Sequence, residues 1–155
     1  MRYILLDRIT LLEPGQRALG VKCVSLSDDI FVDHFPGHPL LPGALIVEGL
    51  AQLGGVLLEQ TVKASGDGER HALLTIIERA KFRRMVRPGD RMELEATVLA
   101  AREDGGQVRA IARVDGHTAA ETELTFAFAK VTNPRVTEQR ARYLRVWMTG
   151  EAEEA

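Results

Sequence analysis

The sequence has little that would indicate an oxidising compartment or a membrane. Only one of its 155 residues, Cys23, is a cysteine, so it offers neither an intrachain disulfide nor a paired-thiol metal or redox site. Residues 1–12 lack the charged, then apolar, then small order of a signal peptide. The longest nearly apolar run, 45–58, is interrupted by polar residues and is shorter than the ~20 residues that span a bilayer. We therefore expect a soluble, cytoplasmic protein with no membrane association.

An excess of charge of either sign is also missing. The chain has 20 Lys and Arg against 22 Asp and Glu, a net charge of −2, which is a poor balance for binding nucleic acid phosphates. Neither a Gly-x-Ser-x-Gly nucleophile motif nor a Walker-type phosphate loop is present. What the chain does have is 45% hydrophobic residues, enough for one core of ordinary size. We expect one folded unit that binds no nucleic acid.

Changes in hydrophobic rhythm place the helices and strands. Rough alternation over 18–29 predicts an early strand, and the many Pro and Gly residues of 31–43 predict a fixed loop. Residues 43–64 predict one long helix, which ends before a turn at 65–68. Beyond that turn, a period of two predicts half-buried strands at 71–77, 91–98, 108–114 and 122–128.

Short turns join these strands, among them Asp115-Gly116, a strong signal for a tight hairpin. Such turns indicate antiparallel pairing without a βαβ crossover, hence an α+β fold. Because the long helix is apolar on nearly all sides, we expect a curved sheet wrapped around it. We assign 1–132 to this domain and 133–155 to a C-terminal extension, with a helix at 133–150 and a frayed tail. The helix has a weak apolar stripe of Val136, Tyr143, Leu144 and Trp147.

The long helix carries a polar stripe that its apolar surroundings do not explain. Glu48, Gln52 and Glu59 fall on one face at 3.6 residues per turn. A buried, unpartnered carboxylate costs several kcal/mol, which proteins usually answer with a raised pKa or an opening onto a cavity. Glu48 is therefore a candidate functional residue; the alternative is that it faces solvent or pairs with an arginine.

Two histidines precede this helix, in the stretch from Asp33 to Pro39. His34 and His38 are four residues apart, but the intervening Pro and Gly prevent the helix that would bring them together on a metal. A histidine in a stiff loop can instead act as a general base near neutral pH. Glu48 would supply the acid, and the Gly43 amide at the helix N-terminus would supply an oxyanion-type donor.

The stretch from His34 to Gln52, HFPGHPLLPGALIVEGLAQ, strongly resembles the signature of the β-hydroxyacyl-acyl-carrier-protein dehydratases of fatty acid synthesis, which have the hot-dog fold. Residues 78–90 resemble a strand and turn of the same family, and the likeness runs from about Arg2 to Ala129. The related branch that also isomerises the double bond has aspartate where Glu48 stands, so the resemblance implies dehydration alone.

The resemblance also implies a mechanism at a dimer interface. Two subunits would join their sheets, with further assembly into a trimer of dimers open, and His34 of one subunit would meet Glu48 of the other. His34 would take a proton from C2 of a (3R)-3-hydroxyacyl thioester, Glu48 would protonate the leaving C3 hydroxyl, and Gly43 would polarise the carbonyl, giving a trans-2-enoyl thioester. Gln52 would support Glu48. The resemblance implies neither metal nor other cofactor. Phe35, Pro36, Gly37 and His38 are candidates for a loop or substrate-entrance role, and for His38 a structural role is favoured.

Five cations gather in nine residues although the whole chain is slightly acidic. One interpretation is a docking site for acyl carrier protein or for the phosphate of its phosphopantetheine arm, and the other is a solvated strand edge that is charged to prevent aggregation. The residues are Arg79, Lys81, Arg83, Arg84 and Arg87.

Two other functions remain open for this sequence. A hot-dog thioesterase would use Glu48 to activate water and would not need His34. A non-catalytic subunit would only bind acyl chains, but it would have no use for a paired base and acid.

Overall fold

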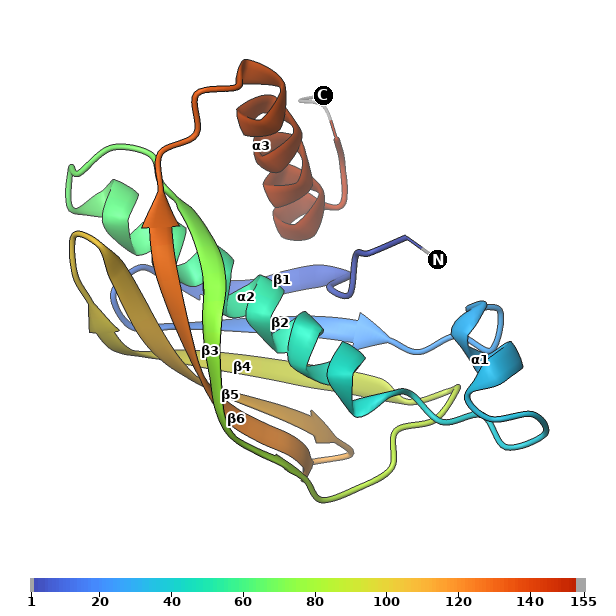
Figure 1. The fold of residues 1–155 in the computed structure, drawn as a ribbon. Helices are drawn as coiled ribbons and strands as arrows, with labels where there is room; N and C mark the ends of the chain where they lie inside the picture. Colours follow the sequence, from blue (N-terminus) through green and yellow to red (C-terminus); the bar gives the residue numbers. More distant parts are fainter. Residues whose placement is uncertain (1, 153–155) are drawn as a thin grey trace.

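The structure is a computed structural model and describes residues 2–152; residues 153–155 of the expected frayed tail lie outside the described part. Six strands form one sheet that curves around a long helix, and two further helices flank it (Figure 1). In chain order the elements are β1 (Arg8–Glu13), β2 (Arg17–Cys23), α1 (Ile30–Asp33), α2 (Gly43–Ala64), β3 (His71–Phe82), β4 (Arg91–Ala101), β5 (Gly105–Val114), β6 (His117–Ala129) and α3 (Pro134–Thr149).

The strands lie in the order β1-β2-β4-β5-β6-β3, and every neighbouring pair is antiparallel. The expected α+β fold, a curved antiparallel sheet around one long helix, is confirmed. Because β3 pairs only with β6 among the described strands, it forms one edge of the sheet, and β1 forms the other. The position of β3 at an edge matters for the site described below.

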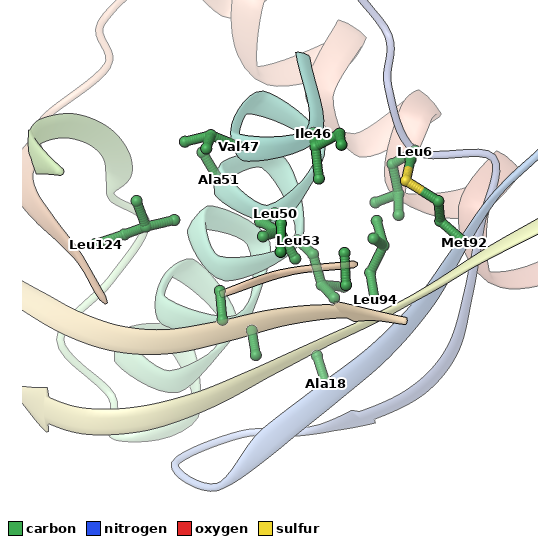
Figure 2. Packing of buried hydrophobic residues seen from close by; sticks show 14 of the residues in the cluster. Leu6, Ala18, Ile46, Val47, Leu50, Ala51, Leu53, Met92, Leu94 and Leu124 are labelled. Atoms are coloured by element: carbon green, nitrogen blue, oxygen red, sulfur yellow. The ribbon is translucent and has the colours of Figure 1, made fainter. Parts of the chain in front are cut away.

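The core lies between α2 and the concave face of the sheet. Leu50, Leu53, Leu57 and Leu58 of α2 are fully buried, and Figure 2 shows Leu50 and Leu53 on the side of α2 that faces the sheet. Burial of each such side chain contributes roughly 1.5–3 kcal/mol. By length and composition α2 could cross a membrane, yet 67% of its most apolar window is buried inside the fold. This burial is what a helix at the centre of a core requires.

Several predicted boundaries were wrong for local reasons. The stretch 31–43 is not loop throughout, because α1 occupies its first residues and buries Phe31. The early strand ends at Cys23 rather than 29, since a turn closed by Asp28 N–H and Ser25 O follows. β3 continues to Phe82, five residues beyond the predicted end, because two irregularities in its pairing with β6 break the alternation of its side chains. A further strand, β1, precedes the early strand and pairs with it.

The C-terminal helix α3 is capped at both ends. The Asn133 side chain accepts a hydrogen bond from the Arg135 amide, and Gly150 ends the helix in the left-handed conformation with φ +85°. Leu144 and Trp147 of the predicted stripe pack against the core, whereas Val136 is exposed. The indole N–H of Trp147 donates to Leu6 O at 2.7 Å. This contact joins α3 to the N-terminal segment, beside which it lies (Figure 1).

Candidate active site

The His34 ring is held by the loop that leads into α2. Its Nδ1 lies 2.7 Å from Leu40 O, and Leu40 N–H donates to His34 O at 3.0 Å. Since a carbonyl oxygen can only accept, Nδ1 carries the proton, and Nε2 is left as the basic nitrogen. The ring is half-buried and stacks on Phe35 with 4.1 Å between centroids. The loop therefore presents an oriented imidazole that is able to take a proton.

The next four residues form a closed, exposed turn. Phe35 N–H donates to His38 O at 3.0 Å, and His38 N–H donates to Phe35 O at 2.8 Å. Gly37 lies between them with φ +70°, a conformation that favours glycine. Phe35, Pro36, Gly37 and His38 are all exposed. An entrance role for this turn stays a prediction.

Glu48 lies one helical turn before Gln52, and their side chains meet as their spacing predicted. Gln52 Nε2 donates to Glu48 Oε1 at 3.1 Å and to Tyr3 O at 3.2 Å, while Gln52 Oε1 accepts from Leu5 N–H at 2.9 Å. The amide of Gln52 thus ties the Glu48 carboxylate to the N-terminal segment. Among residues 2–152 Glu48 forms no ion pair, so pairing with an arginine of the described chain is not what accommodates it.

Sequence reasoning missed Tyr3, whose phenol lies beside Glu48. The negative charge of Glu48 raises the pKa of Tyr3 above its ordinary value, and partial burial and a hydrogen bond to Glu48 raise it further. The approach of residue 3 to residue 48 has no signal in the sequence, because it depends on how the segment before β1 crosses α2.

Glu48 opens onto a cavity of about 300 Å³ between α2, β3 and α3. Its lining is mostly apolar and includes Ala51, Gly55, Val56, Ala72, Leu73, Leu74, Phe126 and Trp147, together with Glu48, Gln52 and Arg140. This is the opening that a carboxylate on a core helix was expected to need. His34 does not line the cavity, and no hydrogen bond joins His34 to Glu48 within the described chain.

Gly43 is the first residue of α2, and its N–H donates no hydrogen bond to the described part of the protein. Pro42 O accepts hydrogen bonds from the N–H groups of Leu45 and Ile46. The N–H groups that precede them in α2, including that of Gly43, remain available to bind a substrate oxygen. A Cβ at Gly43 would lie 2.7 Å from Cε1 of Phe82. The missing side chain therefore lets the end of β3 approach the start of α2.

The five predicted docking cations are exposed along the end of β3 and the segment after it. Arg83 pairs with Glu121 at 3.0 Å, which lowers the pKa of Glu121, and Arg79 lies 3.8 Å from Glu123. Lys81, Arg84 and Arg87 form no ion pair with the described residues. Because Phe82 contacts Gly43, this basic segment borders the N-terminal end of α2.

No group of three His, Cys, Asp or Glu residues within 2–152 is arranged to hold a metal ion.

Comparisons with known proteins agree on one family. Residues 1–124 match the FabA-like domain family. The chain is 43% identical over 128 residues to the 3-hydroxyacyl-(acyl-carrier-protein) dehydratase FabZ of Bacillus velezensis, covering 83% of this chain and 89% of that protein. It is also 43% identical over 123 residues to the FabZ of Clostridium acetobutylicum, covering 79% and 85%.

Solved structures share the hot-dog fold at low sequence identity. The dehydratase heterocomplex ApeI:P from Xenorhabdus doucetiae matches with a TM-score of 0.69 at 16% identity, over 90% of each chain. A thioesterase from Haemophilus influenzae matches with a TM-score of 0.60 at 16% identity, over 81% of this chain and 80% of that one. At such identities the likeness establishes the fold alone.

Proposed function

The chain belongs to the FabA-like family of 3-hydroxyacyl-(acyl-carrier-protein) dehydratases, and we propose that His34, Glu48 and Gly43 perform the dehydration at a site shared by two copies of the chain. The enzyme removes water from a 3-hydroxyacyl thioester in fatty acid biosynthesis. The observation that supports a shared site is that Glu48 opens onto a cavity which His34 of the same chain does not line.

The chemistry follows from the orientation of each group. His34 Nε2 takes the proton from C2 of a (3R)-3-hydroxyacyl thioester, and the C2 electron pair forms the double bond as the C3–O bond breaks. Glu48, in its acid form, gives its proton to the leaving hydroxyl, so the products are water and a trans-2-enoyl thioester. The free Gly43 amide stabilises the charge that develops on the thioester oxygen. Gln52 holds the Glu48 carboxyl group in place. The elimination itself calls for neither a metal nor an organic cofactor.

The edge strand β3 is the surface through which we expect the two copies to pair. Three large apolar side chains are exposed along this strand: Leu73 is 55%, Ile76 48% and Ile77 50% exposed. Unpaired edge strands usually carry charged side chains instead. Leu73 also lines the Glu48 cavity, so a second copy at this edge would close the cavity. The partner could then supply its His34. A cytoplasmic homodimer, with or without assembly into a trimer of dimers, completes the proposal.

Carrier recognition is assigned to the basic segment, defined as Arg79, Lys81, Arg83, Arg84 and Arg87. Its free cations border the Gly43 end of α2, where the thioester carbonyl is expected. An acidic acyl carrier protein bound there could deliver its phosphopantetheine arm without a long reach.

A mixing experiment tests the shared site. His34→Ala and Glu48→Gln are each expected to keep the fold and the dimer but to lose at least ~100-fold in turnover. The two variants are then given different tags and co-purified, so that every dimer contains one copy of each. If His34 and Glu48 come from different chains, one of the two sites is intact and about half of the wild-type activity returns.

If both groups act within one chain, the mixed dimer is as inactive as either variant, and the shared site is wrong. Analytical ultracentrifugation of the wild type and of the mixed dimer gives the assembly state of each. Mass spectrometry of the products separates dehydration from thioester hydrolysis. A thioesterase would release free acid and would keep its activity in His34→Ala.

A further inference from the structure

The C-terminal helix α3 forms one wall of a groove that starts at Glu48. The cavity beside Glu48 adjoins a second one of about 160 Å³ farther along α2, and Val56, Arg140 and Trp147 line both. Arg140 and Trp147 belong to α3, as do Leu144 and Tyr143 in the second cavity. The two cavities are therefore neighbours along α2, and together they are called the groove, with α2 as its floor, β3 on one side and α3 on the other.

The two parts of the groove differ in the charged side chains that line them. Near Glu48 most of the lining is Ala, Gly, Val, Leu, Phe and Trp, with Arg140 as the only other charged residue among the described ones, whereas the far cavity combines apolar residues of α3 with charged or titratable side chains, namely Glu59, Lys63, Glu69, Arg70 and His71. Arg140 forms an ion pair with Glu59, and Glu59 Oε1 also accepts from Ala72 N–H at 2.8 Å. These contacts tie α2, α3 and β3 together at one point. Glu59, the third residue of the polar stripe on α2, thus marks the place where charged side chains begin to gather in the lining.

The wall has a fixed position relative to the catalytic carboxylate. Trp147 donates to Leu6 O at 2.7 Å, and Arg2 donates to the Tyr143 hydroxyl at 3.0 Å. The N-terminal segment held by these contacts is the one that Gln52 ties to Glu48. The match to the FabA-like family covers residues 1–124, so α3 lies beyond the matched residues.

We propose that α3 is a specificity element that encloses the acyl chain of the substrate and that the Arg140–Glu59 pair closes the far end of its channel. The proposal rests on the dehydratase function, which places the reacting carbons beside Glu48. Eleven residues of helix separate Glu48 from Glu59, or about 16 Å. With carbon–carbon bonds of about 1.5 Å in a zigzag, that length holds on the order of ten carbons. The preferred substrates are therefore unbranched, apolar 3-hydroxyacyl chains of short to medium length.

Trp147, the only tryptophan of the chain, provides a direct readout of the groove. The titration uses acyl pantetheine thioesters of short, medium and long chain, with the His34→Ala variant so that no turnover occurs. Because Trp147 lines both cavities, we expect the change in its fluorescence to grow with chain length until the groove is filled and to grow no further with longer chains. A response that does not depend on chain length, or no response, would overturn the enclosure by α3. Because this measurement needs no catalysis, it stands even if the dehydratase assignment fails.

Kinetics of the active enzyme test the closed end. In Arg140→Ala the ratio of kcat/KM for long chains to that for short chains is expected to rise about tenfold, because the channel is opened. Arg142→Ala is the matched control, since Arg142 is exposed on the same helix and lines neither cavity. An equal loss on all chain lengths would mean that Arg140 only stabilises the fold and that the channel has another end. A wild type inactive on every length would instead refute the proposed function.

Discussion

At the scale of single residues, the setting of Glu48 determines what it can do. One carboxylate oxygen is engaged by Gln52, which is itself held by backbone groups of residues 3 and 5. A carboxyl group restrained in this way faces the cavity in a defined orientation, which a proton donor in an elimination needs. The ordered environment comes from the segment that precedes β1, so the N-terminus is part of the site.

Tyr3 gives a test of this arrangement in solution. The Glu48 carboxylate raises the pKa of Tyr3, because a second negative charge beside it is unfavourable. In a Tyr143→Phe background Tyr3 is the only tyrosine, and its ionisation can be followed by ultraviolet absorbance. We expect its pKa to lie above the ordinary value and to fall when Glu48→Gln removes the charge. Glu103→Gln, at an exposed turn, is the control; equal effects of the two changes would show that Tyr3 is not beside Glu48.

The sequence predicted those features of the candidate site that depend on helix geometry. It did not predict those that depend on contacts between residues far apart in the chain. The spacing of Glu48 and Gln52 placed them on one face, and their hydrogen bond confirms it. The contact of Tyr3 with Glu48 depends on a segment without regular structure, whose path no periodicity encodes. The catalytic roles of His34, Glu48 and Gly43 stay predictions, since they depend on a substrate and a second chain.

At the scale of elements, two glycines of α2 differ in what surrounds them. A Cβ at Gly49 would lie 2.9 Å from the backbone oxygen of Leu5, whereas a Cβ at Gly55 would be 3.6 Å from Phe126 and 3.7 Å from Ala72. The first position lets the N-terminal segment lie directly on the helix. The second has room for a methyl group at ordinary contact distance.

Gly49→Ala and Gly55→Ala are therefore expected to differ in their effect on stability. The first is expected to lower the free energy of unfolding by about 1–3 kcal/mol, because a backbone oxygen must move. The second should be neutral or raise it by up to about 1 kcal/mol, because alanine favours the helix. Denaturant unfolding of both variants, with the wild type as reference, measures the difference. Equal destabilisation would show that the close approach of Leu5 to α2 is absent in solution.

The elements themselves were predicted best where one physical pattern dominates. α2 was placed at 43–64 because a breaker-rich loop and a Ser-Gly turn delimit a continuous apolar stretch. Hydrophobic periodicity missed the second half of β3, which only the family resemblance indicated as strand, because its exposed, charged residues lack an alternating pattern while pairing with β6 still holds them in a strand. α1 was missed because a helix of four residues is too short to show a period.

At the scale of the whole molecule, the proposed functions use different parts of one sheet-and-helix unit. The edge of β3 offers the apolar surface for a second copy, the α3 side encloses the acyl chain, and the basic segment borders the Gly43 end of α2. A carrier that approaches the Gly43 end would insert its arm toward the reacting groups while the acyl chain extends under α3. This division predicts that carrier binding can be altered separately from chain-length preference.

Charge reversal of the basic segment tests that separation. Lys81→Glu combined with Arg84→Glu removes two cations without an ion pair in the described chain, so no folded-state ion pair is lost. The measured quantity is the ratio of KM for carrier-bound substrate to KM for the same acyl group on pantetheine. We expect this ratio to rise about tenfold at low salt, and we expect the rise to become smaller as added salt screens the charges. Arg102→Glu is the control, because Arg102 lies in the turn after β4, where its N–H donates to Gly105 O. The neighbouring Gly106 packs against Leu58, which is far along α2 from Gly43. If the relative KM does not change and only solubility falls, the cations are a charged strand edge that prevents aggregation, and the carrier docks elsewhere.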